Sequence, residues 1–179
     1  MQTFFIILCC IFSAATVHAT QTCRTDLIPA STSNSQLIDN GNGTITDLKT
    51  GLMWKQCLEG VSGSSCGRGV PDTFTWQKAL QRPGVINNAG GFAGYTDWRL
   101  PNIKELISLI EEQCAFPAIN LARFPNTPTS ADTPTSYIWS GSPGTAFSDS
   151  AWYVNFGNGS SGTYFRNVSY AVRLVRGGQ

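Results

Sequence analysis

The sequence predicts a single α+β domain built from twisted antiparallel sheets, with one or two helices and long loops. The 179-residue chain contains eighteen Gly and is 11% aromatic, a composition typical of short strands joined by tight turns. Asn-Gly turns separate β-prone runs. One segment further along has apolar residues at helical spacing behind a capping signal. A chain of this length can bury one substantial core.

Residues 1–19 have the pattern of a secretory signal peptide. An apolar run without charged side chains ends in Val17-His18-Ala19, a small-residue cleavage site, and the run is too short for a membrane span of about 20 residues. Cleavage would leave residues 20–35 as a flexible leader held only at Cys23, and residues 36–179 as the folded domain. We expect a secreted, cell-surface or periplasmic protein that does not insert into the membrane after cleavage.

The chemistry left to the mature chain favours recognition over catalysis. His18 is the only histidine, so cleavage removes the imidazole that Ser-His-Asp and Cys-His nucleophile systems need. The net charge of +1, with 13% charged residues, gives no electrostatic footprint for nucleic acid. We therefore expect a protein that is not an enzyme, has no catalytic residues and does not bind nucleic acid.

Four of the six cysteines remain after removal of Cys9 and Cys10 with the signal peptide. An even number in an exported chain favours disulfides over free thiols or a metal site. Three pairings are possible. We predict that Cys57 pairs with Cys66 to close a short Gly/Ser loop, and that Cys23 pairs with Cys114 to tie the N-terminal tail to the end of a helix.

The N-terminal third reads as a three-stranded meander over residues 36–39, 44–47 and 52–55. Its first turn is Asn40-Gly41-Asn42-Gly43, the strongest short hairpin signal. The oxygen-rich stretch 39–47 also resembles a calcium loop, which makes calcium the alternative. However, glycines stand where carboxylates are needed, so the hairpin is favoured and no cofactor is predicted.

Two helices are expected next. Thr75 would cap a short helix over 76–81 that Pro83-Gly84 ends, with irregular structure over 87–91. Asn102 and Glu105 form a capping box, and apolar residues at helical spacing continue that helix to about Cys114. Arg99, just upstream, is expected to pair with Asp97 or Glu105 rather than with a ligand.

The C-terminal part combines a long loop with four strands. Residues 115–136 are rich in Pro, Thr and Ser and predict a surface excursion of the kind that carries function. Strand-like runs follow over 137–142, 151–156, 162–167 and 171–176, with a turn at Asn158-Gly159. In the second run, Trp152, Val154 and Phe156 are the candidates for the core.

Flat aromatic faces mixed with amide and guanidinium groups mark the candidate ligand site. Such side chains can stack on sugar rings and bond their hydroxyl groups. The alternative is an ordinary antiparallel sheet with one buried face. The candidate ligand-binding residues are Trp139, Tyr153, Asn155, Asn158, Tyr164 and Arg166.

Several motifs occur in an order that resembles a known family. They are Asn42-Gly43-Thr44-Ile45-Thr46-Asp47, Thr50-Gly51-Leu52-Met53-Trp54, Trp98-Arg99-Leu100-Pro101, Trp152-Tyr153-Val154-Asn155-Phe156 and Val172-Arg173-Leu174-Val175-Arg176. The series resembles the family typified by the C-terminal domain of the Legionella collagen-like adhesin, itself similar to the C-type-lectin-like superfamily. The resemblance implies a C-type-lectin-like fold and, for the named adhesin, binding to sulfated polysaccharides. This chain lacks both Gly-x-y repeats and a basic cluster.

Two functions follow. The first is an exported binding module that recognises a glycan or a surface protein in adhesion. The second is a structural or assembly component of a bacterial surface or periplasmic complex, with the aromatic residues buried. Solvent exposure of Trp139, Tyr153 and Tyr164 separates the two. The oligomeric state stays open.

Overall fold

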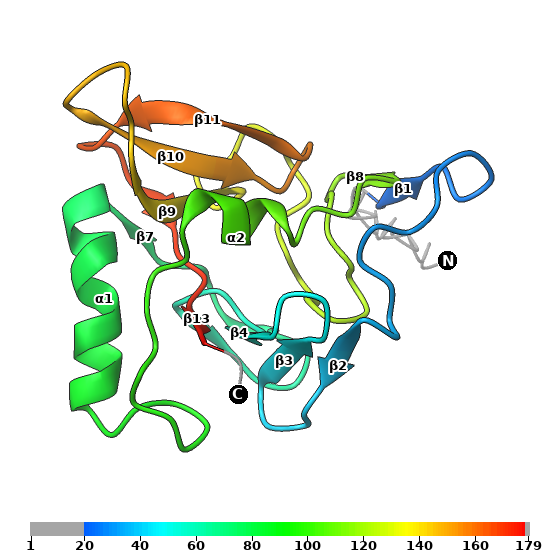
Figure 1. Ribbon diagram of the computed structural model, residues 1–179, viewed down its shortest axis with the longest axis horizontal. Coiled ribbons are helices and arrows are strands. Elements are labelled where there is room, and N and C mark those ends of the chain that lie inside the picture. The colour runs from blue at the N-terminus through cyan, green and yellow to red at the C-terminus, as the bar shows by residue number, and fades with distance from the viewer. Residues whose placement is uncertain (1–19, 178–179) are drawn as a thin grey trace, which may run out of the picture.

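The computed structural model describes residues 20–177 and has the predicted α+β character, with mostly antiparallel sheets and two short helices (Figure 1). The larger sheet has five strands in the order β11-β10-β9-β12-β7. Neighbours are antiparallel, except that β9 and β12 run parallel. The strands are β7 (Thr73–Phe74), β9 (Tyr137–Pro143), β10 (Ser150–Asn155), β11 (Ser160–Phe165) and β12 (Tyr170–Ala171).

The smaller sheet contains the predicted meander. Its order is β13-β4-β3-β2, with β2 (Leu37–Asp39), β3 (Thr44–Asp47), β4 (Leu52–Lys55) and β13 (Val175–Arg176). The hairpin turn is confirmed, with positive φ at Gly41 and Gly43, a conformation that glycine adopts at little cost. Its polar oxygens serve the turn, since Asp39 Oδ1 accepts the Gly41 N–H at 2.8 Å and Asn42 Oδ1 accepts the Thr44 hydroxyl at 2.6 Å.

Helix α1 (Trp76–Asn88) corrects the prediction that this helix ends at Gln81, because it continues through Pro83 and Gly84. A proline inside a helix removes one backbone hydrogen bond and costs about 3 kcal/mol. Burial offsets this cost, since Pro83 and Ala79 are both buried. Asn87 also fixes the last turn, bonding the Trp98 carbonyl at 2.8 Å and the Trp98 N–H at 3.1 Å.

Helix α2 (Ile103–Ile107) begins with the predicted capping box but is shorter than expected. The prediction that it runs to about Cys114 is wrong because the next residues bond elsewhere. The Glu111 N–H donates to the Ala118 carbonyl at 3.1 Å, and Ile110 forms a bridge with Ile119. Strand β8 (Cys114–Ala115) then pairs with β1 (Thr22–Cys23).

Both predicted disulfides, Cys23–Cys114 and Cys57–Cys66, are present. The second closes the Gly/Ser loop, which also carries the small β5–β6 hairpin, with β5 (Val61–Ser62) and β6 (Arg68–Gly69). Disulfides persist in oxidising compartments, which indicates a domain that works outside the cytoplasm. Across residues 20–177, no helix is long and apolar enough to cross a membrane. The predicted signal peptide lies outside the described residues.

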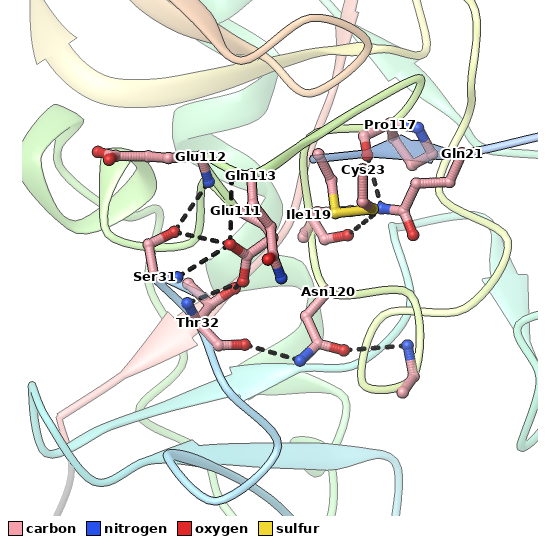
Figure 2. Close-up of a disulfide and its surroundings, with 12 residues drawn as sticks. Gln21, Cys23, Ser31, Thr32, Glu111, Glu112, Gln113, Pro117, Ile119 and Asn120 are labelled. Carbon is pink, nitrogen blue, oxygen red and sulfur yellow. Dashed lines mark hydrogen bonds between the residues drawn. A yellow bond between two sulfur atoms is a disulfide. The ribbon is translucent and has the colours of Figure 1, made fainter. Parts of the chain in front are cut away.

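The segment 20–35 is attached at more points than Cys23, which corrects the expectation of a single attachment (Figure 2). The Gln21 side chain donates to the carbonyls of Pro117 and Ile119, both at 2.7 Å. Further along, Ser31 and Thr32 donate to the two carboxylate oxygens of Glu111. The segment is therefore fastened to the region that follows α2.

Two apolar clusters fill the interior and cover both faces of the five-stranded sheet. Ile138 and Val154 point into one cluster with Leu106 of α2, and Trp139 and Ala151 point into the other with Ala79 of α1. Trp152, predicted for the core, is only half-buried, and its strand has buried residues on both faces. The run 171–176 is divided between β12 and β13, which belong to different sheets.

The loop 115–136 is not purely a surface excursion, which corrects that expectation. Ala118, Ile119 and Phe124 are buried and belong to the core, the last two in the cluster that includes Leu106. The loop therefore contributes to folding as well as to the surface.

Candidate binding surface

Four tyrosines from four adjacent strands come together on one face of the larger sheet. We call Tyr137, Tyr153, Tyr164 and Tyr170 the tyrosine cluster. Tyr170 lies at its centre, with ring centroids 4.8 Å from Tyr137, 5.6 Å from Tyr153 and 6.2 Å from Tyr164. The Tyr137 and Tyr153 rings meet edge to face at 5.2 Å, an arrangement that aromatic pairs favour.

Strand register explains why these rings share a face. Tyr164 pairs with Ala151, and Tyr153 pairs with Gly162. Because Ala151 and Tyr153 are two residues apart on β10, Tyr153 and Tyr164 project from the same face of the sheet. Gly162 is needed here, because a Cβ at this position would lie 3.0 Å from the Tyr153 hydroxyl oxygen. The Tyr153 ring therefore lies across the neighbouring strand, toward the sheet edge.

Two of these tyrosines, Tyr153 and Tyr170, have a raised pKa. Burial, followed by the neighbouring tyrosines, raises the pKa of Tyr170 to about 12, and the same causes raise the pKa of Tyr153. A neutral phenol can both donate and accept a hydrogen bond. The cluster thus offers flat apolar faces together with hydroxyl groups, and Tyr164 is 47% exposed.

Arg166, the residue directly after β11, stacks on the ring of Trp76, which is not part of the tyrosine cluster. Its guanidinium carbon is 4.3 Å from the centre of the Trp76 ring, and its Nε donates to the Ser150 carbonyl at 2.9 Å. Two hollows adjoin it. One of ≈ 500 Å³ is lined by Thr75, Trp76, Gln77, Arg166 and Asn167, and the other of ≈ 410 Å³ by Asp149, Phe165, Arg166 and Asn167.

The structure separates the six predicted site residues. Tyr153 and Tyr164 belong to the tyrosine cluster, and Arg166 follows Tyr164 by two residues on the same chain segment. Asn158 lies in the turn at the opposite end of β11, where its Oδ1 accepts the Ser160 N–H at 3.0 Å. Over the six residues of β11, this separation is on the order of 20 Å.

Trp139 and Asn155 are corrected, because neither side chain is available to a ligand. Trp139 is 0% exposed, and its Nε1 donates to the Phe74 carbonyl at 2.9 Å. Asn155 is 2% exposed. Its amide donates to the Ala131 carbonyl and accepts the Gly157 N–H, both at 2.8 Å, so it holds the loop 115–136 against β10.

Tyr137 and Tyr170 were not among the site residues predicted from the sequence. Tyr137 had a usable signal, because it precedes Trp139 by two residues in a predicted strand and so shares its face. Tyr170 had none, since its position depends on β12 pairing with β9 and β7. That pairing joins segments far apart in the sequence.

These features define an extracytoplasmic, disulfide-bonded α+β domain with an aromatic surface on one sheet. The family model described as the Lcl C-terminal domain matches residues 43–176, and the chain belongs to that family. No curated protein matches the chain. The match confirms the family resemblance and links the chain to a family of adhesins.

Proposed function

We propose that this protein is an exported binding module that recognises a glycan or a surface protein through the tyrosine cluster. The observation that carries the proposal is the grouping of four tyrosines on one sheet face, with Tyr164 47% exposed. Membership of the Lcl C-terminal domain family supports an adhesive role. In line with that family, we infer a C-type-lectin-like fold.

The chemistry of the surface suits recognition. Tyrosine supplies a large contact area at low cost in conformational entropy, because it has only two side-chain dihedrals to fix. Arg166 adds a guanidinium donor beside the cluster. We also propose that the protein catalyses no reaction and binds no nucleic acid.

A structural or assembly role is the second candidate, and burial of Trp139 favours it. That role was expected to bury Trp139, Tyr153 and Tyr164 together. Tyr153 is only half-buried and Tyr164 is exposed, which favours the binding role.

The test is a screen of the purified, disulfide-bonded protein against immobilised polysaccharides and surface proteins, followed by variants. Tyr164→Ala should weaken binding at least about fivefold, the effect of losing 1 kcal/mol. Leu48→Ala is the matched control, since Leu48 is 63% exposed and lies outside the larger sheet. Binding that Tyr164→Ala leaves unchanged would place the ligand elsewhere, and the absence of any ligand would favour the assembly role.

A further inference from the structure

Strand β11 is the outer edge of the five-stranded sheet (Figure 1). It pairs with β10 along its whole length, from Ser150↔Phe165 to Asn155↔Ser160, without a register shift. Natural edge strands are commonly protected by Lys, Pro or a bulge. The strand Ser160–Phe165 contains no lysine, no proline and no other charged residue. Its edge is therefore open to pairing with another strand.

The register identifies which backbone groups face outward. The Arg166 N–H donates to the Asp149 carbonyl at 2.9 Å in continuation of this ladder, and N–H groups alternate sides along an antiparallel strand. On the other side of β10, the Phe156 N–H donates to the carbonyl of Ser136, just before β9, at 2.9 Å. The N–H groups of β10 therefore alternate between β11 and β9 in the same way. Ser161, Thr163 and Phe165 therefore direct their N–H groups away from β10.

These outward groups are self-complementary about Thr163. In an antiparallel pair of identical strands centred there, Thr163 faces its own copy and Ser161 faces Phe165. Each facing pair can exchange two backbone hydrogen bonds, and paired threonines stabilise adjacent strands. The Phe165 carbonyl also accepts the Val168 N–H at 3.3 Å, so in the dimer this oxygen would accept from two donors. Tyr164 of one copy then faces Gly162 of the other, a residue without a side chain of its own, over which the Tyr153 ring of that copy lies. The absence of charge means that like charges do not oppose each other across the axis.

Exposed apolar side chains cluster at the same edge. Phe165 is 53% exposed and Tyr164 is 47% exposed. Phe147, in the neighbouring β9–β10 loop, is 66% exposed, and the Ser150 N–H binds its carbonyl at 3.1 Å. Exposed apolar groups beside an unpaired strand indicate an association surface.

We propose that two copies of this chain form a twofold dimer by antiparallel pairing of β11 with β11, centred on Thr163. The two five-stranded sheets become one continuous sheet. The twofold axis is perpendicular to it, so the two tyrosine clusters lie on the same face. This inference goes beyond the proposed function and does not depend on the identity of any ligand.

Thr163→Pro tests the pairing directly. Proline lacks the N–H that points outward at this position and is tolerated on edge strands, so the fold should be retained while the dimer is lost. Thr163→Val is the matched control, because it keeps the N–H and a β-branched side chain. By sedimentation equilibrium, the wild type and Thr163→Val should be dimers, and Thr163→Pro a monomer with an unchanged circular dichroism spectrum.

A second variant decides the matter if Thr163→Pro does not fold. Thr163→Lys places two positive charges opposite each other across the axis, so it should be monomeric at low salt and regain dimer as salt screens the repulsion. A wild-type protein that is monomeric at every concentration would overturn the proposal. A dimer that persists in the folded Thr163→Pro and Thr163→Lys variants would do so as well.

Discussion

The Arg99 guanidinium and the Glu105 carboxylate are joined by two parallel hydrogen bonds, each 2.7 Å long. Glu105 Oε2 also accepts the Asn102 N–H at 2.8 Å, and Arg99 exchanges backbone hydrogen bonds with Val175. One ion pair therefore fastens the start of α2 to β13, the strand at the edge of the smaller sheet.

Replacement of Glu105 should measurably destabilise the domain. Glu105→Ala removes the carboxylate that accepts the Asn102 N–H in the capping box, and the ion pair with it, so we expect a loss of about 1–2 kcal/mol in the free energy of unfolding. Arg99→Lys keeps the charge and loses only the two-pronged geometry, so its loss should stay below about 1 kcal/mol. Urea denaturation measures both. Equal losses would mean that the cap contributes nothing.

The two disulfides should differ in their effect on stability. The Cys23–Cys114 bridge spans 91 residues and the Cys57–Cys66 bridge spans 9. Loop-closure entropy gives roughly 4.6 and 2.6 kcal/mol respectively. Replacing Cys23 and Cys114 by serine should therefore lower the thermal midpoint more than the same change at Cys57 and Cys66. The reverse order would show that native contacts of the short loop outweigh chain entropy.

Glu111 should make the protein sensitive to acid. Burial acts to raise the pKa of this carboxyl, but the donors from Ser31, Thr32 and Gln113 outweigh it and hold the pKa below its ordinary value of 4.5. Stability from this group is complete above pH 4.5 and is lost as the pH falls through the lower folded-state pKa.

Glu111→Gln tests this, because it removes the charge and leaves some of these donors without an acceptor. We expect a loss of about 1–3 kcal/mol at neutral pH and a weaker dependence of stability on pH below 4.5. Urea denaturation over a pH series is the measurement. Glu112→Gln, at the exposed neighbouring position, is the control and should leave both quantities near those of the wild type.

The tyrosine cluster should make the protein sensitive to alkali. The pKa of Tyr170 is raised from 10.0 to about 12, so the folded state favours the neutral phenol. This contribution to stability is complete below pH 10.0 and is lost as the pH rises toward about 12. Tyr170→Phe should reduce the loss of stability over that interval and stay within about 0.5 kcal/mol of the wild type at neutral pH. An unchanged alkaline profile would contradict this account.

Local signals predicted the elements whose geometry depends on near neighbours. The hairpin at Asn40–Gly43 and the Asn102–Glu105 capping box were both correct, because each is fixed by residues within a few positions. The disulfide pairing was also correct. Helix α1 was predicted too short, since burial of Pro83 depends on a sheet formed by distant strands.

The errors at the candidate site have the same origin. Burial of Trp139 and Asn155 depends on β7 and on the loop at Ala131, which single-strand alternation does not reveal. Arg173 is a further residue whose environment depends on distant segments of the chain. It is 1% exposed and donates to the Lys55 and Gln56 carbonyls. Its partners lie more than a hundred residues earlier.

Strand β13 completes the smaller sheet next to β4, although β2, β3 and β4 all belong to the first third of the chain. During synthesis, one edge of the meander would therefore remain unpaired until β13, more than a hundred residues after β4, had been made. Such long-range closure slows folding. A chain that folds late stays unfolded for longer, which is compatible with a disulfide-bonded domain that reaches its compartment before its tertiary structure forms.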